Sequence, residues 1–524
     1  MTGTIFGING PVLTVNNSAK DSFMMSEMVR VGATQLLAEV IHLRERQTIV
    51  QVFEDTAGCR PGELVEGTSR PLSVQLGPGL LGHIFDGIQR PLNLMGPFIA
   101  RGLQAQQALD PEKNWDVKIQ IRPGDYLSPG CIFAELQETP AIVHKLMVPQ
   151  GVSGKVVFAA ADGRYSLNDS LASVEMAGKT IELGMSQTWP IRIARPVAKR
   201  KIPTQPLLTG QRVIDSFFPI AKGGTAAIPG GFGTGKTITQ HQLAKWSDAD
   251  IIVYIGCGER GNEMTEVLED FSKLTDPRTG HSLMDRTVLI ANTSNMPVAA
   301  REASIYTGIT IAEYYRDMGY HVAIMADSTS RWAEALRELS GRLEEMPAEE
   351  GYPAYLASRL ASFYERAGCV VARGSSKEGS VTIIGAVSPQ GADFSEPVTQ
   401  HTKRFVRCFW ALDRSLAYER HFPAIHWLNS YSDYWDELSD WYKQNISPGF
   451  ESKRRALLQT LYEESRLQEI VKLIGSEALP ESQIQILKTA EQIRQNFLQQ
   501  NAYDPAEAYV PLEQQFKQMN DFML

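Results

Sequence analysis

The sequence predicts a multidomain α/β protein with two β-rich modules, an α/β core and a helical C-terminal domain. The first observation is the length of 524 residues, because a single domain usually holds about 100–150. The second is the stretch 200–430, where apolar strands alternate with helical segments, as in a parallel sheet with crossover helices. The third is the helical spacing of apolar residues beyond residue 430.

Two β-rich segments are expected before the core. In 1–71, short apolar runs such as GPVLTV and QTIVQVF are separated by Gly, Pro and Asn, which predicts a small β-barrel. In 110–190, Val117, Ile119 and Ile121 alternate before the turn RPGD, which predicts an inserted, β-sandwich-like domain. The string KLMVPQGVSGKV is faintly similar to a lipoyl or biotinyl module, but it presents no modifiable lysine, so a structural role is expected.

The α/β core is expected to comprise 72–109 and 191–430, on either side of the insert. The segment 431–524 is then expected to form the helical domain. Its apolar residues recur at helical spacing, and a glycine and a proline end the pattern: Leu457, Leu458, Leu461, Ile470, Val471, Ile474, Gly475 and Pro480.

Composition and charge exclude several classes of protein. Apolar residues at 43% and charged residues at 21% are typical of a globular protein. The net charge is −9 and no basic block occurs, so nucleic acid is not expected as a partner. The apolar runs are strand-length and the N-terminus lacks a signal-peptide pattern, which favours the cytoplasm and a membrane role only through partners. Five scattered cysteines are expected to be small buried residues: Cys59, Cys131, Cys257, Cys369 and Cys408.

The strongest motif is GGFGTGKT, which fulfils the phosphate-loop pattern GxxxxGK[ST]. TAAIP can form a strand before it and ITQHQLAKW a helix after it, so amide N–H groups would converge on phosphate oxygens. Lys236 would reach the β- and γ-phosphates, and the Thr237 hydroxyl would bind Mg²⁺. ATP or ADP is therefore the expected substrate and Mg²⁺ the expected cofactor. The predicted nucleotide-binding residues are Gly230, Gly231, Phe232, Gly233, Thr234, Gly235, Lys236 and Thr237.

Glu259 and Arg260 follow the strand-like string IIVYIGC and are the next candidates. A carboxylate at the C-terminal edge of an α/β sheet lies where ligands bind, and it could orient the attacking water. Arg260 could interact with phosphate charge. Without the phosphate loop, a helix cap or a surface ion pair would be the commoner explanation for such a glutamate.

Asp327 ends a third strand-like string, HVAIMAD. An acidic residue in this position typically holds Mg²⁺, directly or through water, in phosphate-loop enzymes. The alternative is that Asp327 caps the following helix SRWAEALREL, together with Ser328 or Ser330.

Other motifs carry less weight. GPGLLG at 77–82 and GCGERG at 256–261 both match GxGxxG, but the first contains a proline and the second lacks the acidic partner strand of a dinucleotide site. No HExxH, GxSxG or EF-hand pattern occurs, so metalloprotease, serine hydrolase and calcium-sensor functions have no support.

Longer strings around these motifs resemble the catalytic A subunits of V/A-type rotary ATPases. They include TGQRVIDSFFPIAKGG, IGCGERGNEM, ADSTSRWAEALRE and HFPAIHWLNSYS, and the likeness covers essentially 1–450. The resemblance implies a RecA-like nucleotide domain, a water-polarising role for Glu259 with Arg260 beside the phosphate, and an adenine contact for Phe422. At Thr234, eukaryotic members often carry a cysteine, so a prokaryotic origin is expected.

The resemblance also implies partners. An alternating ring of three A and three B subunits is expected, with central and peripheral stalks and a separate membrane rotor. ATP hydrolysis or synthesis would be coupled to H⁺ or Na⁺ movement, and this chain would lie on the cytoplasmic side, attached peripherally through the complex. The alternatives are the β subunit of an F-type ATPase or a type III export ATPase, which normally lack the long insert. A non-catalytic nucleotide-binding ring subunit is disfavoured by the intact phosphate loop with Glu259.

Overall fold

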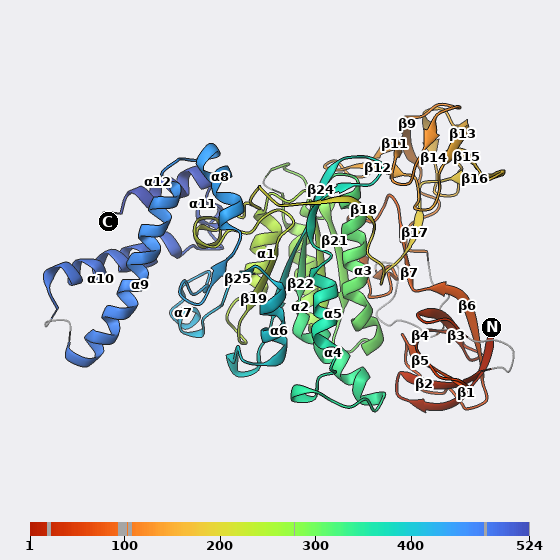
Figure 1. Cartoon of the computed structure of the whole chain (residues 1–524), viewed down its shortest axis with the longest axis horizontal. Helices are drawn as coiled ribbons and strands as arrows, with labels where there is room; N and C mark the ends of the chain where they lie inside the picture. The colour runs from red at the N-terminus through yellow and green to blue at the C-terminus, as the bar shows by residue number, and fades with distance from the viewer. Residues whose placement is uncertain (18–22, 93–101, 103–106, 277, 476–478, 523–524) are drawn as a thin grey trace. The chain divides into compact units, whose positions relative to one another are not determined.

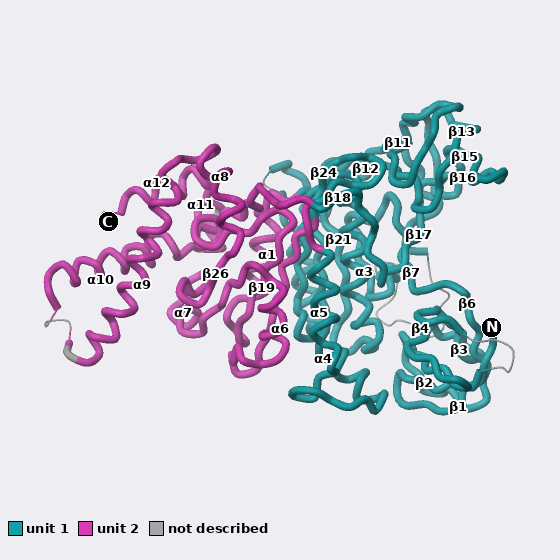
Figure 2. The backbone as a smooth tube through the Cα atoms, in the orientation of Figure 1, with its two compact units in different colours: residues 1–200, 250–366, 370–380 teal, residues 201–249, 367–369, 381–524 magenta. Residues whose placement is uncertain are grey.

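The structure is a computed structural model that describes residues 1–17, 23–92, 102, 107–276, 278–475 and 479–522. The chain divides into two compact units (Figure 2). Unit 1 comprises 1–200, 250–366 and 370–380, and unit 2 comprises 201–249, 367–369 and 381–524. The predicted core segment 72–109 lies outside the described residues at 93–101 and 103–106.

The N-terminal strands of unit 1 form a closed barrel, as the sequence predicts (Figure 1). Its order is β1-β2-β5-β4-β3-β6, with bounds Thr2–Asn9, Val12–Asn17, Gln47–Val52, Leu36–Leu43, Glu27–Val31 and Leu64–Pro71. Side chains alternate in and out along the strands, and the inward ones form one apolar core that includes Leu13, Val15, Val29, Val31, Val50 and Val65. Closure leaves no exposed sheet edge.

The insert consists of two antiparallel four-stranded sheets. One has the order β10-β13-β15-β16, with bounds Tyr126–Leu127, Gly154–Ala159, Ala172–Met176 and Lys179–Leu183. The other has the order β12-β11-β9-β14, with bounds Val143–Met147, Ile132–Gln137, Trp115–Ile119 and Gly163–Tyr165. Both sheets contribute to a single core that includes Val117, Phe133, Leu146, Val156 and Val174. This arrangement confirms the predicted sandwich-like insert.

The glycine-rich turn at 77–82 holds a carboxylate of the insert. The amides of Gly79, Leu80 and Leu81 donate to Glu138 Oε1 at 2.8, 3.1 and 3.3 Å. Glu138 Oε2 also lies 2.6 Å from His144 Nδ1, and both side chains are almost fully buried. The amides of this turn therefore bind an internal carboxylate, which gives the GPGLLG segment a structural role.

Unit 1 also contains a parallel sheet with the order β22-β20-β21-β8. The strands span His321–Asp327, Ile251–Cys257, Thr287–Asn292 and Ile84–Phe85, and the helices α2, α3, α4 and α5 span Gly261–Lys273, Val298–Asp317, Thr329–Arg342 and Leu356–Tyr364. β20, β21 and the last six residues of β22 are buried without alternation, as expected for strands covered on both faces. A short antiparallel pair joins β7, Ser73–Leu76, to β17, Gln187–Pro190.

Unit 2 contains the strand before the phosphate loop. β19, Thr225–Pro229, pairs in parallel with β24, Glu378–Val387, and with β25, Cys408–Phe409. β25 pairs antiparallel with β26, Tyr431–Ser432. The accompanying helices are α1, Lys236–Trp246, α6, Pro397–Phe405, and α7, Arg414–Tyr418.

The C-terminal part of unit 2 is helical, as predicted (Figure 1). Its helices α8, α9, α10, α11 and α12 span Trp435–Asn445, Phe450–Ile474, Glu481–Ile493, Pro505–Ala508 and Leu512–Asn520. Gly475 follows α9 with φ +82°, and Pro480 precedes α10, so the two predicted breakers act as helix boundaries. Among the described helices, none combines the length and apolarity needed to cross a bilayer.

The expectation that all five cysteines are buried is only partly right. Cys257, Cys369 and Cys408 are buried, whereas Cys59 and Cys131 are partly exposed. The two exceptions lie in connections between strands, where the chain runs along the surface.

Candidate nucleotide site

The phosphate loop of unit 2 connects β19 to α1 as the motif predicts. Gly235 precedes the first helical residue with φ +90°, a conformation that favours glycine. A Cβ atom at Gly235 would also lie 3.6 Å from Cε1 of Phe422, so the ring packs directly against the loop. The helix N-terminus and the loop amides give this segment the positive character that attracts phosphate.

The polar side chains of the loop are held by main-chain carbonyls. Lys236 Nζ donates to the carbonyls of Gly230 and Gly231 at 2.7 and 2.9 Å. The buried Thr234 hydroxyl donates to the Gly231 carbonyl at 2.9 Å, whereas Phe232 is 88% exposed. The ammonium group is therefore kept at the loop, where it can exchange carbonyl oxygens for phosphate oxygens.

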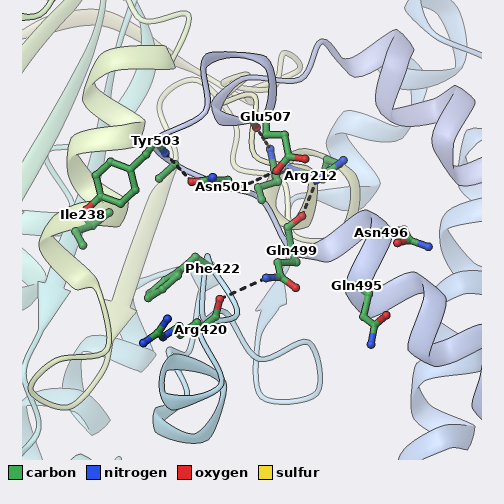
Figure 3. Close-up of a pocket in the computed structure, with 12 residues that line it drawn as sticks. Arg212, Ile238, Arg420, Phe422, Gln495, Asn496, Gln499, Asn501, Tyr503 and Glu507 are labelled. Carbon is green, nitrogen blue, oxygen red and sulfur yellow. Dashed lines mark hydrogen bonds between the residues drawn. The ribbon is translucent and has the colours of Figure 1, made fainter.

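A cavity of about 630 Å³ lies beside the loop within unit 2 (Figure 3). Phe422 and Tyr503 contribute aromatic rings, and Ile238, the residue after Thr237, lies beside them. The wall also contains polar side chains: Arg212, Arg420, Gln495, Asn496, Gln499, Gln500, Asn501 and Glu507. A volume of this size and a mixture of rings and hydrogen-bonding groups are typical of small-molecule sites.

Hydrogen bonds fix the cavity wall. The Gln500 amide donates to the Phe422 carbonyl at 2.6 Å, which joins the segment after α10 to the loop that carries the ring. Arg212 Nη2 donates to the Gln499 carbonyl at 2.6 Å, and Asn501 N donates to Glu507 Oε2 at 3.0 Å (Figure 3). The hydrogen bond from Gln500 to its main-chain carbonyl therefore holds Phe422 in place.

In unit 1, Glu259 and Arg260 lie in the short connection between β20 and α2. The preceding Gly258 has φ +74°, and a Cβ atom there would lie 2.7 Å from Arg331 Cβ, so glycine is required for two reasons. Glu259 is partly buried, whereas Arg260 is exposed and precedes the first residue of α2. The expected edge position after a parallel strand is confirmed for both residues.

The surroundings of Glu259 favour its protonated form. Burial and the nearby carboxylates Asp327 and Glu263 raise its pKa to about 8, and the Arg331 guanidinium opposes this shift. A raised pKa makes the carboxylate a stronger base, as general bases require near neutral pH.

Asp327 ends β22 in the same unit and is 3% exposed. The Tyr254 hydroxyl donates to its Oδ2 at 3.3 Å. Ser328, rather than Asp327, caps α4, because the Ser328 hydroxyl accepts from the Arg331 amide at 3.4 Å. The carboxylate is thus not used as the helix cap, and an oxygen donor of this kind suits the hard cation Mg²⁺, as does the Thr237 hydroxyl.

Arg331 and the cavity wall around Tyr503 lie outside the sequence motifs that predict the site. Arg331 lies one turn into α4, with its guanidinium bound to both oxygens of Glu334 at 2.8 Å. Its sequence signal is the position four residues after Asp327, which points a long cation back toward the strand end. For Tyr503, which lies 81 positions after Phe422, no local pattern links the two residues.

The predicted site residues thus form two groups, one in each compact unit. Unit 2 brings together the phosphate loop, Lys236 and Phe422. Unit 1 brings together Glu259 and Asp327, with Arg331 added by the structure. Arg260 is at the same strand end, where its side chain is exposed.

Family models match four successive parts of the chain. The model for the ATP synthase alpha/beta family beta-barrel domain matches 5–69, and that for the alpha/beta subunit barrel-sandwich domain matches 106–192. The model for the nucleotide-binding domain of the same family matches 210–432. The model for the C-terminal domain of V and A type ATP synthase matches 439–523.

Full-length relatives agree with these matches. The V-type ATP synthase alpha chain 2 of Clostridium tetani is 61% identical over 99% of this chain and 88% of its own length. The V-type ATP synthase alpha chain of Halothermothrix orenii is 57% identical over 98% of this chain and 88% of its own length. A solved structure of the assembled ATPase EscN, from an enteropathogenic E. coli type III secretion system, matches with a TM-score of 0.70 over 99% of both chains, and its 22% identity shows the fold alone. The predicted fold class and the resemblance are therefore confirmed, and the chain belongs to the alpha-chain family of V-type and A-type ATP synthases, which are ion-translocating ATP hydrolases and synthases.

Proposed function

We propose that this chain binds Mg·ATP at its phosphate loop and that Glu259 activates the water that attacks the γ-phosphate. The observation that carries the proposal is the arrangement within unit 2, where the phosphate loop adjoins a cavity lined by Phe422 and Tyr503. Unit 2 then offers adjacent places for the triphosphate and for the adenine of the nucleotide.

The adenine would occupy this cavity. Its π face would contact Phe422, the residue that the family resemblance implies, and Tyr503 would supply a second ring. The side-chain amides of Gln499 and Asn501 can donate and accept hydrogen bonds at the base edge. The base would thus be held by stacking and by adaptable polar contacts.

The triphosphate would extend from the cavity over the loop to the N-terminus of α1. Lys236 would exchange the carbonyls of Gly230 and Gly231 for β- and γ-phosphate oxygens. Thr237 and Asp327 would hold Mg²⁺, which neutralises charge on the phosphates when it is bound. Arg260 and Arg331 would stabilise the negative charge that develops on the transferred phosphoryl group.

Glu259 would accept a proton from the attacking water. Burial beside Asp327 and Glu263 raises its pKa, which increases its basicity. In the synthesis direction the same carboxyl would return the proton.

We further propose the assembly in which this site works. The chain would alternate with B subunits in a ring of three A and three B subunits, connected by central and peripheral stalks to a membrane rotor. It would then lie in the cytoplasm and reach the membrane only through the complex. Membership in the ATP synthase family supports the existence of a multisubunit complex.

The proposal is tested by Lys236→Ala in the purified complex. Loss of the ammonium removes a cation aimed at the β- and γ-phosphates, so we expect productive ATP binding and turnover to be lost. Thr265→Ala in α2 removes an exposed hydroxyl that donates to the Gly261 carbonyl and serves as the control. Steady-state ATPase near the wild-type rate in the Lys236→Ala complex would contradict the assignment of the phosphate loop.

A further inference from the structure

Two main-chain hydrogen bonds support the connection that carries Glu259. The Gly258 amide donates to the Asn292 carbonyl at 2.7 Å, and the Ser294 amide donates to the Glu259 carbonyl at 2.9 Å. Both supporting residues belong to the end of β21 and the loop after it. The direction of the Glu259 side chain therefore depends on the position of that neighbouring loop.

Arg301, in the first turns of α3, supports this loop through a side-chain hydrogen bond. Its Nη2 donates to the Ser294 carbonyl at 2.8 Å. A Cβ atom at Gly258 would lie 3.1 Å from Arg301 Cδ, so the arginine stem packs against the Glu259 connection as well. One side chain thus contacts both the supporting loop and the segment that it supports.

The main chain of Arg301 is itself fixed to the sheet. Its carbonyl accepts from the Cys257 thiol at 3.5 Å and from the Ser304 hydroxyl at 2.7 Å. Cys257 is the last residue of β20, directly before the Gly258–Glu259 segment. Arg301 is therefore attached to β20, the strand that ends directly before the Gly258–Glu259 segment.

We propose that Arg301 is a positioning residue that acts through Ser294 to hold Glu259 in the direction needed for water activation. This inference rests on the proposed role of Glu259. It assigns Arg301 a task different from that of Arg331, which acts on the Glu259 carboxyl through its charge. Removal of the guanidinium frees the Ser294 loop, and a misplacement of about 1 Å in a reacting group can reduce turnover about 10²-fold.

The test is a double-mutant cycle in the assembled complex, with Arg301→Met, Glu259→Gln and the combination. In the wild-type background, Arg301→Met is expected to lower kcat roughly 10- to 100-fold while the Kd for Mg·ADP stays unchanged. In the Glu259→Gln background, Arg301→Met is expected to cause no further loss of kcat, because the carboxylate that Arg301 would position is already absent. General damage to the fold would instead add to the loss in both backgrounds.

Two further variants sharpen the test. Arg301→Lys keeps a donor for the Ser294 carbonyl and is expected to recover most of the lost turnover. Arg164→Met replaces an arginine of the insert whose side chain is 73% exposed, and it is expected to leave kcat and Kd at wild-type values.

Each contrary result has a separate meaning. If Arg301→Met weakens Mg·ADP binding as much as it lowers kcat, Arg301 is a nucleotide ligand and the positioning role is wrong. If Glu259→Gln is slow but Arg301→Met lowers its turnover further, the link through Glu259 is wrong and the proposed function stands. If Glu259→Gln turns over at the wild-type rate, the proposed role of Glu259 fails, and the positioning role of Arg301 fails with it.

Discussion

In the proposed site, Phe422 contacts the adenine and not the phosphates, so its replacement separates the two parts of nucleotide binding. Its ring packs on Gly235 of the phosphate loop, and its carbonyl is fixed by Gln500. Replacement by Ala would remove the stacking face and leave the loop cations in place. The triphosphate would still be held, but the adenine would lose its aromatic partner.

We expect Phe422→Ala to weaken nucleotide binding by roughly 1–3 kcal/mol, which is about a 5- to 150-fold rise in Kd. Tyr418→Ala, which removes a 70% exposed ring from α7, is the matched control. Equilibrium binding of ATP and of inorganic triphosphate to the complex measures the effect, and only ATP should respond. An unchanged Kd for ATP would contradict the adenine contact.

The phosphate loop could be predicted from sequence because its chemistry is local. The loop amides, Lys236 and Thr237 all lie within eight consecutive residues, so their spacing alone identifies the phosphate-binding loop. The roles of Tyr503 and Arg301 could not be predicted in this way. Tyr503 lines the same cavity as Phe422, 81 positions earlier, and Arg301 packs against the Gly258–Glu259 connection, more than 40 positions earlier, so only the folded chain brings these residues together.

The hairpin of β11 and β12 is anchored to α3 by buried polar groups. Glu138 accepts from three amides and from the Tyr315 hydroxyl at 3.1 Å, and His144 Nε2 lies 2.9 Å from the Tyr314 hydroxyl. Buried polar groups are costly unless they are paired, so this set of contacts specifies one position of the hairpin on the helix.

We expect Glu138→Ala to destabilise this anchor by about 3–5 kcal/mol, because it leaves His144 and three amides buried without their acceptor. Hydrogen exchange of 132–147 measures the local opening free energy. Glu135→Ala on the same strand, where the side chain is partly exposed, is the control. Equal protection of this segment in both variants would show that Glu138 is not the anchor.

The same anchor predicts a pH dependence. Burial opposes ionisation of Glu138, but the charge and hydrogen bond of His144, with the amides of Gly79 and Leu81, outweigh it and lower its pKa below the ordinary 4.5. The stabilisation by the ionised carboxylate is therefore present above about pH 4.5 and is lost as the pH falls through the lower pKa of the folded state. The hydrogen-exchange protection of 132–147 in the wild type should therefore approach that in Glu138→Ala as the pH is lowered. A difference in protection that stays constant with pH would contradict the role of the ionised Glu138 carboxylate.

Element types followed from the sequence more readily than element pairing. The helical spacing and the breakers at Gly475 and Pro480 predicted α9 and the start of α10. The run IIVYIGC predicted β20. The order of strands in the barrel and the packing of the turn 77–82 around Glu138 could not be predicted, because each depends on contacts between residues far apart in sequence.

The cations that we propose for catalysis belong to several parts of the chain. Lys236 belongs to the phosphate loop, and Arg260 and Arg331 flank Glu259. Phosphoryl transfer spreads negative charge over three equatorial oxygens, and many such enzymes add an arginine from a neighbouring protein chain. In the proposed ring, that arginine would come from the B partner.

We therefore expect the isolated chain to bind Mg·ATP but to hydrolyse it very slowly. An arginine supplied in trans typically contributes about 10³–10⁵ in rate, so addition of the B partner should raise kcat steeply while the Kd for nucleotide changes little. Steady-state ATPase against increasing B partner, with nucleotide held constant, measures the gain. A B partner with its interfacial arginine changed to Ala controls for assembly alone, and it should form the ring without the gain in rate. If the isolated chain already hydrolyses ATP as fast as the ring, its own cations suffice and the shared site is wrong.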